Sequence, residues 1–279
     1  RAFEASGPSC RDAHDTWRAL SARVFTGAPT LDRDNAQANF YALCRRANEY
    51  RNGARLLSDS KGDEDVRAFV MAAVKHNGNE LRRANKSFWI DREIVLAAVT
   101  QNGLILRYME AEFKEDFDIV LAAVTNNGQA LLYVDSDVEN YREIVLAAVT
   151  QNGLILRYAD EDLKKDREIV LAAVKEDGNA LLYASVLLKK DRAFIMSAVT
   201  RNGRALRYVD PKFKNDPEIV LAAVTQNGYA LRYADEDLKR DHKIVMAAVT
   251  RNGLALRDVD ASLQNDPEIV LAAATAVAA

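Results

Sequence analysis

The sequence predicts an all-α fold, an α-solenoid of short helical repeats, and three observations lead to that prediction. A block of six apolar residues, such as Ile94–Val99, recurs along the chain. An acidic residue suited to a helix N-terminus precedes nearly every block. An Asn-Gly or Asp-Gly pair follows each block at equal intervals of about 25 residues, a period typical of repeat proteins. The glycines of these pairs are Gly78, Gly103, Gly128, Gly153, Gly178, Gly203, Gly228 and Gly253.

The first half of each repeat is predicted to be an α-helix with an aspartate N-cap. A carboxylate at this position accepts hydrogen bonds from the first-turn N–H groups and complements the helix dipole. Proline follows the cap in Asp216-Pro217 and Asp266-Pro267, where it suits the first helical position. Glycine at the other end is expected to be the left-handed residue that stops the helix. The expected caps are Asp91, Asp116, Asp166, Asp191, Asp216, Asp241 and Asp266, with Tyr141 as the exception.

The second half of each repeat is predicted to be a shorter helix followed by a single capped turn. The third residue after the glycine is leucine in all eight repeats, at Leu81, Leu106, Leu131, Leu156, Leu181, Leu206, Leu231 and Leu256. One apolar residue per repeat is expected to be buried by the turn, at Phe88, Phe113, Val138, Leu163, Leu188, Phe213, Leu238 and Leu263. The next aspartate cap follows three residues later, so the connections must be tight.

Leucine-rich repeats are the alternative architecture, because their period is similar, at about 20–29 residues, and six apolar residues can form a buried strand. Two features disfavour them. The Ala97-Ala98 pair is a poor strand core, and an Asp-Pro start with a glycine stop brackets a helix. The alternating leucines and the asparagine of the leucine-rich consensus are also absent.

The chain divides into residues 1–64, a helical N-terminal region with a degenerate entry repeat, and residues 65–279, the tandem repeats. Trp17, Leu20 and Val24 are spaced for one amphipathic helix, and residues 35–50 predict a second. Gly53 lies one period before Gly78, which indicates an atypical first repeat. Terminal repeats of solenoids are expected to be atypical because one face lacks a neighbour.

Composition indicates a soluble, intracellular protein. The formal charge of -3 gives no reason to expect a polyanionic partner. The two cysteines, Cys10 and Cys44, disfavour a disulfide framework and favour a reducing compartment. No apolar run reaches the roughly 20 residues of a membrane span. The chain opens on Arg1 without a signal-peptide core, which both a processed precursor and a fragment would explain.

Nothing in the sequence indicates a catalytic, metal or cofactor site. The histidines, His14, His76 and His242, are far apart and occupy unrelated repeat positions. The cysteines lack metal-ligand spacing. The Asn-Gly pairs follow helices, whereas a phosphate-binding loop precedes one. We therefore expect no enzyme activity and no cofactor.

A surface ridge is the candidate functional site. Positions one and four after the repeat glycine share a helix face; the first varies freely, and the fourth is arginine except at Leu132 and Leu182. Tyrosine usually follows at position five, and arginine and tyrosine are enriched at interface hot spots. The candidate residues are Arg107, Tyr108, Arg157, Tyr158, Arg207, Tyr208, Tyr229, Arg232, Tyr233 and Arg257.

Three interpretations of this ridge remain open. The arginines could pair with acidic neighbours such as Asp160 and Asp235 while the tyrosines seal the core. They could stack single-stranded RNA, one base per repeat, although the net charge disfavours nucleic acid. They could bind protein, which predicts a scaffold or a structural subunit of a multi-subunit complex. A non-catalytic arm of a larger enzyme or effector is a further alternative.

The segment from Ile219 to Ala234, with its pattern Ile-Val-Leu-Ala-Ala-Val-x-x-Asn-Gly-x-Ala-Leu-x-Tyr-Ala, resembles a family of tandem repeats known only as a domain of unknown function. The resemblance covers about residues 65–275 and extends to eight repeats. It implies helical repeats and no established activity, cofactor or catalytic residue. The family is associated with bacterial effector-like proteins and with algae and other protists, which would allow an organelle such as a plastid.

Overall fold

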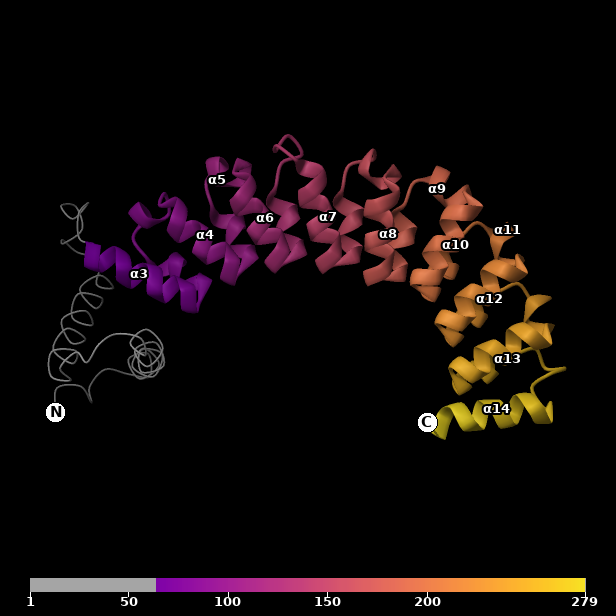
Figure 1. Cartoon of the computed structure of the whole chain (residues 1–279). Coiled ribbons are helices and arrows are strands. Elements are labelled where there is room, and N and C mark those ends of the chain that lie inside the picture. The colour runs from indigo at the N-terminus through magenta and orange to yellow at the C-terminus, as the bar shows by residue number, and fades with distance from the viewer. Residues whose placement is uncertain (1–63, 279) are drawn as a thin grey trace, which may run out of the picture. The chain divides into compact units, whose positions relative to one another are not determined.

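The structure, a computed structural model, describes residues 64–278, a range in which helices are joined by turns and short loops (Figure 1). No strand occurs between these residues, so the predicted all-α solenoid is confirmed and the leucine-rich alternative is wrong. The helices expected before residue 64, together with His14, Cys10 and Cys44, lie outside the described residues. The predicted boundary between residues 64 and 65 stays a prediction.

Each repeat contains an α-helix, a 3-10 helix and a short variable segment. The α-helices are α3 (Glu64–His76), α4 (Arg92–Gln101), α5 (Ala111–Glu115), α6 (Phe117–Asn126), α7 (Tyr141–Gln151), α8 (Arg167–Glu176), α9 (Val186–Lys190), α10 (Arg192–Arg201), α11 (Pro211–Lys214), α12 (Pro217–Gln226), α13 (His242–Arg251) and α14 (Pro267–Ala278).

The 3-10 helices have two lengths. Those that follow the repeat glycine are η1 (Gly78–Arg83), η3 (Gly103–Tyr108), η4 (Gly128–Tyr133), η5 (Gly153–Tyr158), η7 (Gly178–Tyr183), η8 (Gly203–Tyr208), η9 (Gly228–Tyr233) and η11 (Gly253–Asp258). Single turns follow at η2 (Lys86–Phe88), η6 (Leu163–Lys165) and η10 (Leu238–Arg240).

The chain forms two compact units, divided after Ile105 within η3. In the first unit, α3 packs on α4, and η1 packs on both. In the second unit, each long α-helix from α6 to α14 packs against the next, and the 3-10 helices form a parallel column that starts at η4. Helices adjacent in the sequence are therefore adjacent in space within each unit (Figure 1).

The core consists mainly of four positions on each of α4, α6, α7, α8, α10, α12 and α13, and of two apolar positions on each of η3, η4, η5, η7, η8 and η9. In α8 the buried residues are Ile169, Val170, Ala173 and Val174. In η7, Ala180 and the invariant Leu181 are fully buried. Burying a large aliphatic side chain contributes about 1.5–3 kcal/mol, and these residues are covered from both adjoining repeats. One repeat alone cannot provide that coverage, which explains why the fold is an array.

The seven predicted aspartate caps are confirmed. In α8, Asp166 accepts hydrogen bonds from the backbone N–H groups of Glu168 and Ile169 at 2.9 and 3.2 Å. The exceptional repeat begins at Tyr141 instead. Its preceding residue, Asn140, has a φ of 55° and makes no side-chain cap bond. It is the one non-glycine residue with positive φ among residues 64–278.

The prediction for the repeat glycines is wrong. None of the seven glycines with described surroundings (Gly78 and the six from Gly128 onward) adopts the left-handed conformation. In six of them an added Cβ would lie closer than 3.0 Å to a backbone carbonyl oxygen of the next α-helix; for Gly153 this is the oxygen of Ala173. Glycine is required because neighbouring backbones approach closely, and the small Ala173 leaves room for that approach.

The helix stop comes from the residue before the glycine. Asn152 has extended backbone angles, φ -150° and ψ 101°. Its N–H donates to the carbonyl of Ala148 at 3.0 Å, which completes α7. Its side chain accepts from the N–H of Leu154 at 3.1 Å, which caps η5. One asparagine therefore ends one helix and begins the next, and Asp177 does the same before η7.

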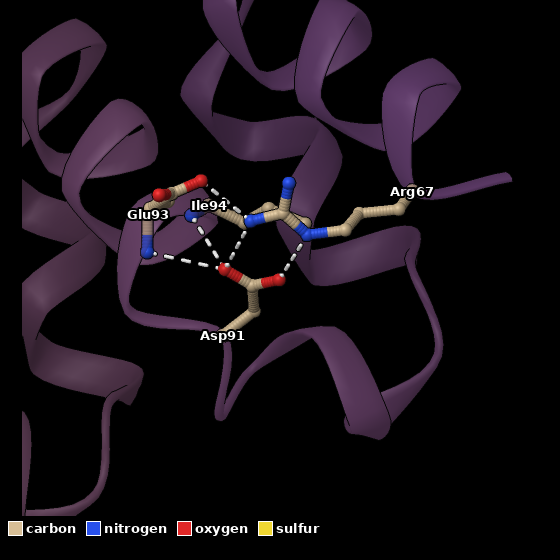
Figure 2. Close-up of polar contacts among 4 residues, drawn as sticks. All are labelled: Arg67, Asp91, Glu93 and Ile94. Carbon is tan, nitrogen blue, oxygen red and sulfur yellow. Dashed lines mark hydrogen bonds and ion pairs between the residues drawn. The ribbon is translucent and has the colours of Figure 1, made fainter. Parts of the chain in front are cut away.

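An ion-pair clamp joins consecutive repeats at their helix N-termini (Figure 2). The Nε of Arg67 donates to the carboxylate of Asp91 at 2.7 Å, and its Nη2 donates to Glu93 at 2.7 Å. Asp91 also accepts from the N–H groups of Glu93 and Ile94, so the cap and the clamp share one carboxylate. These hydrogen bonds outweigh the effect of burial and lower the pKa of Asp91.

The same clamp recurs in the second unit and is absent at defined positions. Arg142 and Arg192 each bind the next aspartate cap and the glutamate two residues beyond it. The rule is that an arginine in the first turn of the helix pairs with acids 24 and 26 residues later. Phe117 and Pro217 occupy the arginine position in two repeats, so those repeats have no clamp of this kind.

Candidate protein-binding ridge

The proposed ridge lies on the 3-10 helices, at the first, fourth and fifth residues after each repeat glycine. Residues three apart are eclipsed in a 3-10 helix, so positions one and four form a single row. No residue of the ridge is buried. The exposed members are Arg107, Tyr108, Arg157, Tyr158, Arg207, Tyr229, Arg232 and Arg257, and the half-buried members are Tyr208 and Tyr233.

Arginine and tyrosine side chains are stacked along this ridge. The guanidinium carbon of Arg207 lies 5.2 Å from the ring centre of Tyr208 and 5.9 Å from that of Tyr233, in the next repeat. Arg232 lies 5.6 Å from the ring centre of the same Tyr233. The four side chains therefore form a continuous cluster across two repeats. Each such contact at an exposed site contributes about 0.5–1 kcal/mol.

The same arrangement recurs earlier in the second unit. Arg107 lies 5.0 Å from the ring centre of Tyr108 and 5.7 Å from that of Tyr133. Arg157 lies 4.7 Å from the ring centre of Tyr158. A tyrosine at position five thus holds the arginine of its own repeat and, in two cases, the arginine of the preceding one.

The interpretation in which these arginines pair with acidic neighbours does not hold. Within residues 106–278, the side chains of Arg107, Arg157, Arg207 and Arg232 form no ion pair. Asp235 instead accepts from the backbone N–H of Asp237, at 3.2 Å, and so stabilises its own turn. Tyr158 is too exposed to act only as a seal, since it retains 46% of its accessible surface, whereas Tyr208 and Tyr233 are half-buried.

The ridge of the second unit has two different halves. From η4 to η7 it is largely apolar, because Leu132, Leu154 and Leu182 are exposed by 44%, 36% and 47%. From η8 to η11 it is basic and aromatic, with Arg204, Arg207, Arg232 and Arg257 alongside the tyrosines. Asp258, which replaces tyrosine in the last repeat, is the one carboxylate among the ridge positions of this half.

The repeats match a known sequence family, described as Domain of unknown function (DUF4116). The matches cover residues 67–114, 91–138, 141–189, 191–239 and 241–275. The chain belongs to this family. Matches that begin at 91, 141, 191 and 241 are two periods apart, so one DUF4116 unit comprises two of the structural repeats. No curated protein and no solved structure matches the chain.

The pairwise unit agrees with the alternation on the ridge. Leu132 and Leu182 lie two periods apart, and the arginines of the stacks, Arg107, Arg157 and Arg207, are also two periods apart. The DUF4116 array therefore presents arginine and leucine in alternate repeats from η3 through η7. After η7 this alternation ends, because Arg232 occupies the position where a third leucine would fall.

No other candidate site emerges from the described part of the DUF4116 array. Residues 64–278 contain no cluster of three or more His, Cys, Asp or Glu residues arranged to hold a metal. His76 is exposed, and the Nε2 of the exposed His242 lies 3.7 Å from Glu268. No helix within these residues is long and apolar enough to cross a membrane. The expectations of no catalysis and no cofactor stay predictions.

A shallow hollow lies away from the ridge, on the α-helix side of the second unit. It has a volume of about 460 Å³ and lies between α10 and α12, lined by Thr200, Glu218, Leu221, Ala222, Thr225 and Gln226. No ridge residue lines it. Its lining provides one charged group and no cluster of convergent donors, so the ridge remains the better candidate for recognition.

Proposed function

We propose that this DUF4116 array is a non-catalytic protein-binding scaffold, which holds a partner on its Arg–Tyr ridge and can serve as a structural subunit of a larger assembly. The observation that carries the proposal is the cluster of Arg207, Tyr208, Arg232 and Tyr233. It combines exposed cations that lack acidic partners with aromatic rings that already position them.

The chemistry of this cluster is that of an interface rather than of a core. Tyrosine and arginine are the residue types that dominate binding hot spots. Stacking on a ring fixes the guanidinium before a partner arrives, so less conformational entropy is lost on binding. The fold itself is held by buried aliphatic residues and by the clamps, and it makes little use of the ridge side chains.

Single-stranded nucleic acid is the alternative occupant, because stacked tyrosines and arginines also bind bases and phosphates. Two features favour protein over nucleic acid. Leu132 and Leu182 interrupt the cationic row, although a phosphate backbone carries a charge at every nucleotide. The chain has a formal charge of -3, so no basic excess would attract a polyanion from a distance.

Capture of partners from an extract of the source cells tests the proposal. The wild-type chain is expected to retain a defined protein, and the triple variant Arg207→Ala, Arg232→Ala, Tyr233→Ala is expected to lose it. A matched control, Lys190→Ala with Lys243→Ala, removes two exposed cations that lie off the ridge and should retain the partner.

The proposal would be overturned if the triple variant, shown to be folded by circular dichroism, captured the same protein as the wild type. Raising the salt concentration separates the alternative. A nucleic acid held through phosphates should dissociate steeply with salt, whereas a protein docked partly on leucine and tyrosine should be retained.

A further inference from the structure

We infer that the ridge of the second unit binds an extended acidic peptide segment, with one carboxylate for each arginine and apolar side chains opposite the leucines. This inference rests on the proposed protein-binding function and names the chemistry of the partner. Its three supports are the charge of the ridge, the state of its guanidinium groups and the spacing of the repeats.

The charge of the ridge differs from that of the chain. Between η8 and η11 the ridge positions include Arg204, Arg207, Arg232 and Arg257, with Asp258 as the single acid. By contrast, Arg142 and Arg192 of the same unit are paired with acids in the clamps. The ridge is therefore a local cationic surface on an acidic protein, which favours acidic partners for reasons of electrostatic complementarity.

The guanidinium groups of the ridge are arranged to accept a carboxylate. A guanidinium that lies over a ring uses its face for the aromatic contact, and its N–H groups point outward in the plane. Those N–H groups match the two oxygens of a carboxylate in a bidentate pair. Arg207 is held between two rings and makes no hydrogen bond to any described residue of the second unit, so its donors remain available.

The spacing of the repeats selects an extended peptide. Packed helices lie about 8–10 Å apart, so successive ridge arginines are separated by about that distance. A polyproline II segment rises about 3.1 Å per residue with three residues per turn, so every third side chain of such a peptide faces the ridge, at intervals of about 9 Å. One peptide residue in every three therefore lies opposite one repeat of the ridge.

The order of residues along the ridge then predicts the pattern of the peptide. Position four of the second unit reads Arg107, Leu132, Arg157, Leu182, Arg207, Arg232 and Arg257. The complementary peptide has acidic, apolar, acidic, apolar, acidic, acidic and acidic residues at every third position, in one direction or the other. A uniform phosphate backbone does not complement the two leucines, so nucleic acid is the poorer match.

Fluorescence anisotropy with defined probes tests this inference on the full chain. The first probe is a labelled peptide with leucine and glutamate in the predicted order at every third position. The second has the same composition with its glutamates at every second position. The third is a labelled oligouridylate. We expect the first probe to bind at least about tenfold more tightly than the second, a difference of about 1.4 kcal/mol.

Ridge variants then assign the contacts. Arg207→Lys keeps the charge but loses the planar fork, so it should weaken the first probe, whereas Lys190→Ala with Lys243→Ala should not. Leu182→Glu should weaken a probe with leucine opposite residue 182 and should strengthen one with lysine there. Equal affinity for both peptides, or binding of the oligouridylate alone, would overturn the inference.

The two proposals fail in different ways. If the triple ridge variant loses its cellular partner but the wild type does not prefer the first peptide, the scaffold function stands and the acidic, extended partner is wrong. If the triple variant keeps its cellular partner, the protein-binding ridge itself is wrong, whatever the peptides do.

Discussion

The buried contact between neighbouring repeats, called the seam here, and the exposed ridge differ in how much their residues vary from repeat to repeat. At the seam the same residues recur, such as the glycine of one repeat against the alanine carbonyl of the next, and an added methyl group has no space. On the ridge, position one holds asparagine, leucine, glutamine, arginine or tyrosine in different repeats, and these residues are exposed or half-buried.

The contrast explains how one period carries both a fold and a specific surface. Close-packed interiors respond to the change of a single methylene, so the seam cannot vary from repeat to repeat. Each ridge position contacts few residues of its own chain, so it can change without loss of the fold. The pattern of the ridge, rather than any one repeat, therefore distinguishes one array from another.

The largest effect should come from breaking the period itself. Deleting residues 166–190 removes one period and places Asp191 where Asp166 stood, so Arg142 still finds an aspartate cap. This variant should remain helical and unfold cooperatively in a urea titration. Deleting only residues 166–177 places a 3-10 helix where α8 stood and should abolish cooperative unfolding. Equal behaviour of the two deletions would show that the period is not the structural unit.

A single methyl group at the seam should have the next largest effect. Because Gly153 is not left-handed, alanine there would ordinarily stabilise the protein by about 0.4–1 kcal/mol through the unfolded state. The Cβ, however, would meet the carbonyl oxygen of Ala173. Gly153→Ala should therefore lower the free energy of unfolding, by about 1–3 kcal/mol. Gln151→Ala, at an exposed site two residues earlier, is the control and should be nearly silent.

Low pH should weaken the aspartate caps and the ion-pair clamps at the helix N-termini. Burial raises the pKa of Asp166, whereas hydrogen bonds from Arg142 and from the N–H groups of Ile169 and Glu168 lower it. The hydrogen bonds have the larger combined effect, so the pKa lies below its usual value. A lowered folded pKa contributes stability above the unfolded value of about 3.9, and that contribution is lost as pH falls through the folded pKa.

Urea unfolding measured from pH 6 to pH 2 (roughly the span over which carboxylates titrate) checks this expectation. Asp166→Asn keeps a capping side chain but no longer titrates, so its stability should depend less steeply on pH than that of the wild type. Exposed Asp137, which makes no clamp, provides the matched control as Asp137→Asn. Identical pH profiles for all three proteins would exclude a role for the clamp.

The sequence alone correctly predicted the 25-residue period, the α-helix in the first half of each repeat, the aspartate caps and the exposure of the ridge. Those features depend on local patterns, which a sequence displays directly. It failed at Gly153, because the reason for that glycine is a backbone contact with Ala173 in the next repeat. It also predicted an unspecified short helix where the structure has a 3-10 helix, since six residues with one buried leucine fit either geometry.

The clamp was missed although the sequence contains its signal. Arg142 is followed by Asp166 and Glu168, and Arg192 by Asp216 and Glu218, at constant separations of 24 and 26 residues. Each aspartate was assigned to capping alone, and the glutamates and the arginines were given no role. On the ridge the arginines were correctly placed outside, but their stacking on tyrosine required the register between neighbouring 3-10 helices.

The smallest effect on folding should come from the ridge, and it bears most directly on the contrast with the seam. Arg207 contacts its chain through the rings of Tyr208 and Tyr233, and no carboxylate of residues 106–278 pairs with it. Arg207→Ala should therefore lower the free energy of unfolding by no more than about 1 kcal/mol. A double-mutant cycle with Tyr233→Ala should return a coupling of about 0.5–1 kcal/mol. If Arg207→Ala lowers the free energy of unfolding as much as Gly153→Ala does, the ridge is needed for the fold. Its residues could then not vary independently of the fold to suit a partner.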